Sequence, residues 1–301
     1  MEKVKLDPTI VREFKLWLKS KEGLSMNTYR NYGNYIVQLV AMPQAYTIDK
    51  EKIDKFFLLK NNPVKNSAVK SFVSFLEYEK EIEIDRFRYP RIRKHSKVVT
   101  PLTSEEKRIL IEKMYPEWTL FAEVMFGGAL RVSECSGIQV ENFNWQEWVK
   151  DRKKYGSLKV TKTKRNKERI IPIKPELMEK ILKYCPKEEG GLKRGYLFDF
   201  NHARYVRKKK KKYGLELAEL KYINKNSEYF QKIIGWVSEK HLSRRVTSHI
   251  LRHSRATELD EMGLSASSIR DYLGHENIST TSKYIHNTPE KLKKQLEKLG
   301  A

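Results

Sequence analysis

Apolar residues recur at helical spacing along the first 85 residues of the chain. Spacings of three and four residues are typical of helices that bury one face. Four such groups are present: Ile10, Phe14 and Trp17; Tyr29, Tyr32, Ile36 and Leu39; Ile53, Phe56 and Phe57; and Val69, Phe72, Val73 and Leu76. Pro43 and Pro63 fall in the breaks between these groups. The pattern therefore predicts a small four-helix domain over residues 1–85.

A basic stretch separates this pattern from the next one. The segment from Arg86 to Lys97 has six basic residues, one proline and no acid, which is typical of a linker. Thr103 followed by Glu106 matches a capping box, so a new helix is expected to begin there. We therefore expect a linker over residues 86–102 and a second domain over residues 103–301, with a C-terminal tail at residues 285–301.

The second domain is predicted to be mostly helical, with one small antiparallel sheet. Two short segments, residues 157–163 and 168–173, read as strands of a hairpin joined by a basic turn. The pattern over residues 219–240 fits no single element. Helical patterns are present at residues 120–130, 175–185 and 203–220. After Thr247, further helical segments alternate with tight turns at Gly263 and Gly274.

Charge indicates the kind of partner. The chain has 61 Lys and Arg against 38 Asp and Glu, a formal net charge of +23, and both predicted domains are basic. Because such an excess is self-repelling, a polyanionic partner is expected. The sequence has no run of 18 apolar residues, so a membrane-spanning helix is not expected. The first residues lack the apolar segment of a secretory signal, and Cys135 and Cys185 are too few for a disulfide framework or zinc cluster, which favours the cytoplasm.

Two arginine-containing segments could bind phosphate. Arg131 follows two glycines that allow a tight turn, and a guanidinium group can bind two phosphate oxygens at once. The alternative is a surface arginine paired with Glu134 three residues on. His249 and Arg252 share one helix face, which suits a proton acceptor beside a phosphate-binding cation, although His249 could instead be a structural histidine.

Two further segments could supply a nucleophile and an acid. His275 follows the turn at Gly274, and Tyr284 lies nine residues further on, although a lone tyrosine is more often a packing residue. The predicted hairpin turn carries Lys162, Lys164, Arg165 and Lys167. A lysine there could reach a scissile phosphate as a general acid, or the turn could contact DNA without specificity.

Taken together, these motifs resemble the tyrosine site-specific recombinases, the family of Xer recombinases and phage-type integrases. The family's first arginine motif is matched by residues 128–134, with Ala129 as a conservative replacement for the commoner glycine. The lysine hairpin is matched by Asn166–Pro172, the His-x-Leu-Arg-His motif by His249–His253, and the nucleophile motif by residues 273–275 with Tyr284. The first domain resembles the family's core-binding domain.

The resemblance implies a role for each matched residue. Tyr284 would attack the scissile phosphate and form a 3′-phosphotyrosine, Lys164 (or Lys162) would protonate the leaving 5′-oxygen, and His249 would take the proton of the tyrosine. Arg131 and Arg252 would stabilise the transition state, and His275 would donate a hydrogen bond to the phosphate. Glu134 would orient Arg131, with His253 in support. Neither a metal nor any other cofactor is implied.

The resemblance also implies the partners, which are double-stranded DNA with specific recombination sites and further copies of the chain. Pro289 opens a segment with an apolar stripe at Leu292, Leu296 and Leu299, which could fold back onto its own domain or dock on the next copy. Docking on the next copy fits a monomer in solution that assembles as a tetramer on two DNA sites. DNA contacts are expected at Arg91, Arg93, Lys94, Lys162, Arg165, Lys167, Lys208, Lys210 and Lys212.

The biological role is left between several possibilities. The long, lysine-rich stretch at residues 185–245 favours an integrase of a mobile element. A Xer-like chromosome-dimer resolvase, a type IB topoisomerase and a non-catalytic DNA-binding regulator are the alternatives. In each case we expect a cytoplasmic protein that associates with the nucleoid.

Overall fold

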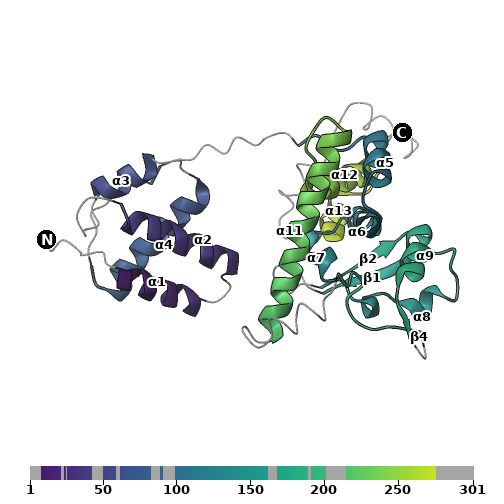
Figure 1. Cartoon of the computed structure of the whole chain (residues 1–301), viewed down its shortest axis with the longest axis horizontal. Helices are drawn as coiled ribbons and strands as arrows, with labels where there is room; N and C mark the ends of the chain where they lie inside the picture. The colour runs from purple at the N-terminus through teal and green to yellow at the C-terminus, as the bar shows by residue number, and fades with distance from the viewer. Residues whose placement is uncertain are drawn as a thin grey trace. The chain divides into compact units, whose positions relative to one another are not determined.

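The computed structural model describes residues 8–21, 24, 26–42, 50–58, 62–82, 89–90, 99–161, 168–188, 191–200 and 215–275. The chain divides into two compact units, residues 1–97 and 98–301. Figure 1 shows the helices and strands of each unit. The division falls inside the segment for which the sequence predicts a linker, while the separate roles of the two units stay predictions.

In the described part of the first unit there are four helices, as the apolar spacing predicts. They are α1 (Pro8–Ser20), α2 (Met26–Val40), α3 (Lys50–Leu58) and α4 (Pro63–Glu79). Their buried faces meet around Phe14, Phe56 and Phe72, none of which is more than 1% exposed. The Asn62 side chain accepts a hydrogen bond from the Lys65 backbone N–H at 2.9 Å. Pro63 is therefore the first residue of α4, a position where its missing N–H costs nothing.

The second unit, as far as the structure describes it, is mostly helical with two short antiparallel strand pairs, so the predicted fold class is confirmed. Its elements are α5 (Ser104–Glu112), α6 (Pro116–Gly127), α7 (Val132–Ser136), η1 (Val140–Asn142), α8 (Trp145–Trp148), β1 (Gly156–Val160), β2 (Arg169–Ile173), α9 (Pro175–Tyr184), β3 (Lys187–Glu188), β4 (Gly191–Leu192), α11 (Leu215–His241), α12 (Ser248–Glu261) and α13 (Ala266–Leu273). The core forms around α6, where Phe121 packs against Phe198 and Phe230 with ring centroids 4.9 and 4.6 Å apart.

The predicted hairpin is present, and its register fixes which residues flank the turn. Strand β1 pairs antiparallel with β2 from Gly156 opposite Ile173 to Val160 opposite Arg169. Leu158 and Ile171 are fully buried on one face. The turn itself, residues 162–167, lies outside the described residues. The β3–β4 pair was not predicted, because each strand is two residues long and too short for an alternating pattern.

Residues 219–240, for which the sequence pattern indicates no single element, belong to helix α11. It is continuous over 27 residues and packs on α5, α7 and α12 (Figure 1). Its buried face holds Ile223, Phe230, Ile234 and Val237. The polar Asn226 and Ser238 are also buried on the helix, which obscures the apolar period in the sequence. No helix in the described part of the chain is long and apolar enough to cross a bilayer.

The capping box at the start of α5 gives a test of the fold. Thr103 accepts a hydrogen bond from the Glu106 N–H at 3.1 Å, and the Thr103 N–H donates to the Glu106 carboxylate at 2.9 Å. Thr103→Ala should lower the free energy of unfolding by about 1 kcal/mol, measured by urea denaturation. Thr103→Ser keeps the cap and should stay within about 0.5 kcal/mol of the native chain. Equal losses in both variants would contradict the role of the cap.

Candidate active site

A buried carboxylate organises the residues that the motifs predict. Glu134 is the third residue of the short helix α7, and its side chain is 1% exposed. It accepts a hydrogen bond from the backbone N–H of Arg131 at 2.8 Å, at the helix end where backbone N–H groups are otherwise unpaired. Its two oxygens also face the guanidinium groups of three arginines: Arg131, Arg169 and Arg252.

The three arginines come from different elements and differ in exposure. Arg131, the N-cap of α7, places Nη1 2.6 Å from Oε1 of Glu134 and is 33% exposed. Arg169, the first residue of β2, contacts both carboxylate oxygens, at 2.9 and 3.2 Å, and is 10% exposed. Arg252 of α12 lies 3.6 Å from Oε2 and is 7% exposed. Arg131 is therefore the member of this cluster that is most accessible to a ligand.

The same three arginines also donate hydrogen bonds to the backbone at the C-terminal end of α13. Three successive carbonyl oxygens each accept a hydrogen bond from a different guanidinium group. Tyr272 O accepts from Arg169 Nε at 3.0 Å, Leu273 O from Arg252 Nη2 at 2.5 Å, and Gly274 O from Arg131 Nη2 at 3.4 Å. Cations are favoured at a helix C-terminus, where these carbonyl groups carry partial negative charge.

Gly274 ends α13 in the left-handed conformation, with φ +65°. A β-carbon at this position would lie 2.9 Å from Nη1 of Arg169, so the close approach of backbone and guanidinium requires glycine. His275 follows directly. The turn thus brings the candidate histidine to the end of the helix that contacts the arginines.

The pKa of Glu134 reflects opposing effects. Burial raises it, but the hydrogen bonds and charge of Arg169, the Arg131 backbone N–H and the charge of Arg252 outweigh burial and lower the pKa to about 2. The carboxylate is therefore ionised at neutral pH. Three guanidinium groups around one carboxylate leave an excess of positive charge, which suits a phosphate group.

Both candidate histidines have lowered pKa values. Partial burial, followed by the charges of Arg252, Arg131 and Arg169, lowers the pKa of His275 to about 4, with Glu134 acting in the opposite direction. Partial burial, followed by the charges of Arg252 and Arg131, also lowers the pKa of His249 in the first turn of α12. Both are neutral at pH 7. Each therefore offers one hydrogen-bond donor and one acceptor.

The structure corrects the expectation for Ala129. The sequence suggests a conservative replacement of glycine, but Ala129 has φ +45°, a region that costs residues with a side chain about 1–2 kcal/mol. The methyl group is fully buried, and the carbonyl oxygen accepts a hydrogen bond from Arg252 Nη1 at 2.8 Å. The replacement is conservative in size and strained in backbone conformation.

The remaining predicted residues divide into two groups. His253 lies on α12, with Nδ1 3.5 Å from the hydroxyl oxygen of Thr257. Outside the described residues lie Lys164, Tyr284, Arg91, Arg93, Lys94, Lys162, Arg165, Lys167, Lys208, Lys210 and Lys212, whose roles stay predictions. Within the described ranges, no group of three His, Cys, Asp or Glu side chains is arranged to hold a metal ion.

Tyr272 is a second tyrosine close to this turn, and its hydroxyl is used within the protein. It donates this hydroxyl to Gly127 O at 2.7 Å, and burial raises its pKa. Tyr272 is thus a packing and hydrogen-bonding residue, and Tyr284 stays the predicted nucleophile. Arg169, in contrast, was missed as a site residue. Arg169 lies within the hairpin motif Asn166–Pro172. The alternation of side chains along a strand does not reveal that this side chain contacts the carboxylate of Glu134 on α7.

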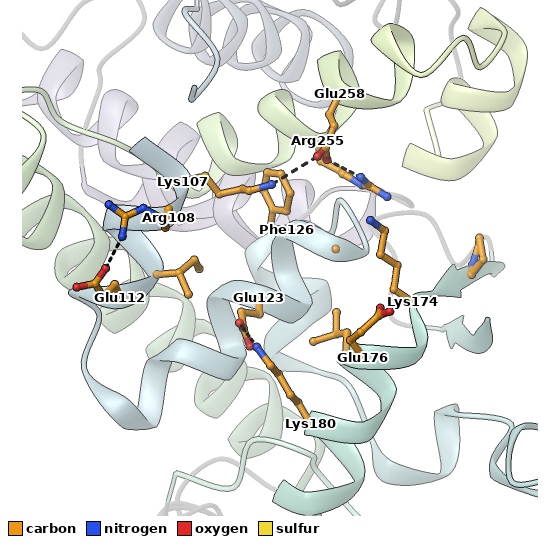
Figure 2. Close-up of a pocket in the computed structure, with 14 residues that line it drawn as sticks. Lys107, Arg108, Glu112, Glu123, Phe126, Lys174, Glu176, Lys180, Arg255 and Glu258 are labelled. Atoms are coloured by element: carbon orange, nitrogen blue, oxygen red, sulfur yellow. Dashed lines mark hydrogen bonds and ion pairs between the residues drawn. The ribbon is translucent and has the colours of Figure 1, made fainter. Parts of the chain in front are cut away.

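A cavity of about 610 Å³ opens between α5, α6, α9 and α12 (Figure 2). Most of the charged side chains around it pair with one another: Lys107 and Arg255 with Glu258, Arg108 with Glu112, and Lys180 with Glu123. Its lining also includes the apolar side chains of Ile111, Phe126 and Leu177. Because most of its charges are balanced by their neighbours, this cavity is a poorer phosphate site than the cluster around Glu134.

Comparisons with known proteins agree with the geometry. Residues 101–291 match the family model described as the phage integrase family. The chain is similar to the tyrosine recombinase XerA of Pyrococcus furiosus, with 27% identity over 99% of this chain and 96% of that protein. It is also similar to the tyrosine recombinase XerC of Listeria monocytogenes, with 27% identity over 94% of both chains.

Solved structures share the fold. The Tn1549 transposon integrase in complex with transposon right end DNA has a TM-score of 0.64 and 13% identity, covering 97% of this chain and 99% of that one. A lambda integrase tetramer bound to a Holliday junction has a TM-score of 0.59 and 18% identity, covering 93% of this chain and 77% of that one.

The low pKa of Glu134 predicts how stability depends on pH. Because the folded-state pKa of about 2 lies below the ordinary value of 4.5, ionised Glu134 stabilises the fold above pH 4.5, and this contribution is lost as the pH falls towards 2. The destabilisation caused by Glu134→Gln should therefore shrink by about 3 kcal/mol between pH 6 and pH 2. Urea unfolding at several pH values measures this difference.

Glu105→Gln is the matched control for this measurement. Glu105 pairs with Arg108 on the exposed face of α5, so its replacement should have little effect at any pH. A destabilisation by Glu134→Gln that does not depend on pH would contradict the assignment of a buried, ionised carboxylate.

Proposed function

The chain belongs to the phage integrase family and is a tyrosine recombinase, an enzyme that cleaves and rejoins DNA, and we propose that it integrates or excises a mobile element at specific DNA sites. The observation that supports a phosphodiester substrate is the cluster of Arg131, Arg169 and Arg252 around one buried carboxylate. Its excess positive charge is fixed before a ligand arrives, as stabilisation of a charged transition state requires.

The proposed cleavage step uses residues from four motifs. The Tyr284 oxygen attacks the scissile phosphorus, the bond to the 5′-oxygen breaks, and a 3′-phosphotyrosine and a 5′-hydroxyl result. His249 accepts the tyrosine proton, and Lys164 protonates the leaving oxygen. Arg131 and Arg252 bind the nonbridging oxygens, and His275 donates a hydrogen bond to one of them. Rejoining reverses these steps with a new 5′-hydroxyl, so the phosphotyrosine bond conserves the energy of the broken one.

The lowered pKa values support this division of roles. A neutral His249 can accept a proton from tyrosine at pH 7, whereas a protonated histidine could not. A neutral His275 can still donate one hydrogen bond. Glu134 contacts all three arginines and is buried, which supports an orienting role.

The proposed biological role rests on fewer observations than the proposed chemistry. Integration or excision of a mobile element is favoured by the long, lysine-rich stretch over residues 185–245. Chromosome-dimer resolution is the second candidate, because relatives that match nearly the whole chain carry the names XerA and XerC. Recombination between two copies of the chromosomal site, compared with two copies of an element end, distinguishes these roles. Relaxation of supercoiled DNA without exchange would indicate topoisomerase activity instead.

We further propose double-stranded DNA and other copies of the chain as partners. A monomer in solution would assemble as a tetramer on two sites in the cytoplasm, at the nucleoid. Removal of residues 289–301, which carry the apolar stripe of the tail, would then abolish pairing of two sites while sparing binding to one.

Replacement of the proposed nucleophile tests the chemistry. A duplex site is selected from random sequences by binding to the protein, and a nicked version traps covalent complexes that survive detergent. Tyr284→Phe should bind this DNA and form no covalent complex, and the native chain should remain active in excess EDTA. Tyr272→Phe is the control and should still form the complex, because its hydroxyl is bound to Gly127 O. Covalent complexes with Tyr284→Phe, or a requirement for magnesium, would contradict the proposal.

The lowered pKa of His249 predicts the pH dependence of cleavage. Because the pKa of this histidine lies below its ordinary value of 6.5, cleavage should decline as the pH falls, with a midpoint below 6.5. The rate of covalent complex formation by the native chain, compared with His249→Asn, provides the measurement. A native decline centred at or above pH 6.5 would contradict the role of His249 as proton acceptor.

A further inference from the structure

Arg169 connects the hairpin to the arginine cluster. It is the first residue of β2, five residues after Lys164 and opposite Val160 of β1. Its side chain turns into the unit and is 10% exposed. Nη1 and Nη2 donate to the two oxygens of Glu134 at 3.2 and 2.9 Å. This two-point contact fixes both the position and the plane of the guanidinium group.

The same side chain also contacts the turn that carries His275. Arg169 Nε donates to Tyr272 O at 3.0 Å, at the end of α13. Its Nη1 lies where a β-carbon on Gly274 would come within 2.9 Å. One arginine therefore joins β2, α7 and α13.

Arg169 is held within the protein at all three of its nitrogen atoms. Three of its five N–H groups, one from each nitrogen, donate to Glu134 or to Tyr272. Because the side chain is only 10% exposed, it presents little surface to DNA. Its action on the reaction must therefore pass through the residues that it holds.

The other ion pair at this end of the hairpin differs in character. Lys159 and Glu168 lie 2.7 Å apart on the outer surface, and each is 51% exposed. Exposed pairs of this kind contribute about 0–1 kcal/mol and restrain their strands weakly. The buried contact of Arg169 is the stronger candidate for holding the hairpin against the cluster.

We propose that Arg169 is a positioning residue: by fastening the start of β2 to Glu134 and to the end of α13, it sets the position from which a lysine of the preceding turn acts as general acid. This inference rests on the proposed function, and in particular on a lysine of the turn as general acid. Lysine cannot replace Arg169, because an ammonium group lacks the planar pair of donors that matches a carboxylate.

Arg169→Lys and Arg169→Gln test the inference on two nicked substrates. One has the ordinary 5′-bridging oxygen at the scissile phosphate, and the other has sulfur, which leaves without a proton. A misplaced general acid should slow cleavage of the oxygen substrate by about 10- to 100-fold, at the lower end of the effect of a positioned acid. Cleavage of the sulfur substrate should stay within a few-fold of the native rate.

Two further variants make the result interpretable. Lys164→Ala should show the same rescue by sulfur, to a larger degree, because it removes the acid itself. Lys159→Gln removes the exposed pair and should leave both rates unchanged. Because each variant is compared with itself on the two substrates, an unfolded fraction lowers both rates alike, and the ratio of the two rates tests the inference even if the Arg169 variants fold poorly.

Equal slowing of both substrates in the Arg169 variants would overturn the inference, since loss of stability or of phosphate binding affects both alike. Native rates in these variants would overturn it as well. A different outcome marks failure of the proposed function. If the native chain forms no covalent complex, or if sulfur rescues neither Lys164→Ala nor Lys162→Ala, then the general-acid assignment fails, not the role of Arg169.

Discussion

The buried Glu134 carboxylate is the group on which the arrangement of the site depends. Three guanidinium groups, from residues as distant in sequence as Arg131 and Arg252, converge on its two oxygens. Burying a carboxylate costs free energy unless it is paired with a cation and hydrogen-bonded. Removing the carboxylate would leave the buried guanidinium groups with uncompensated charge. The three last carbonyl groups of the α13 turn complete the arrangement, because each accepts a hydrogen bond from one of the same arginines. The fold is thus needed to bring the arginines together, and the carboxylate is needed to keep them together.

This arrangement has an electrostatic consequence for catalysis. One carboxylate does not balance three arginines, so the site is positive before any DNA arrives, and the neighbouring histidines are kept neutral. A site with these properties favours an anionic ligand and retains a proton acceptor at neutral pH. Because the guanidinium groups are already fixed by protein contacts, little reorganisation is required when negative charge develops on the phosphate. The strained backbone at Ala129 is consistent with this view, since its carbonyl oxygen holds Arg252 in place.

Sequence reasoning reached much of the fold and part of the site. The four helices of the first unit, the capping box at Thr103 and the β1–β2 hairpin follow from local patterns, and the structure contains all three. Arg131, Arg252 and Glu134 were identified from motifs, and the structure brings them together. Arg169 could not be identified in this way, because its contacts depend on how β2 packs on α7 and α13. The length of α11 was also missed, since buried Asn226 and Ser238 interrupt its apolar pattern. Lys164 and Tyr284 stay predictions.

The central claim is that the arginines organised by Glu134 act on the negative charge of the scissile phosphate. Replacing one nonbridging oxygen of that phosphate with a methyl group removes this charge, and comparison of the native chain with Arg131→Ala on both substrates measures the interaction directly. The account predicts that Arg131→Ala slows cleavage of the ordinary phosphate by about 10²–10³, and that this loss nearly disappears on the methylphosphonate. An equal loss on both substrates would contradict it, because Arg131 would then contribute through something other than the charge of the phosphate.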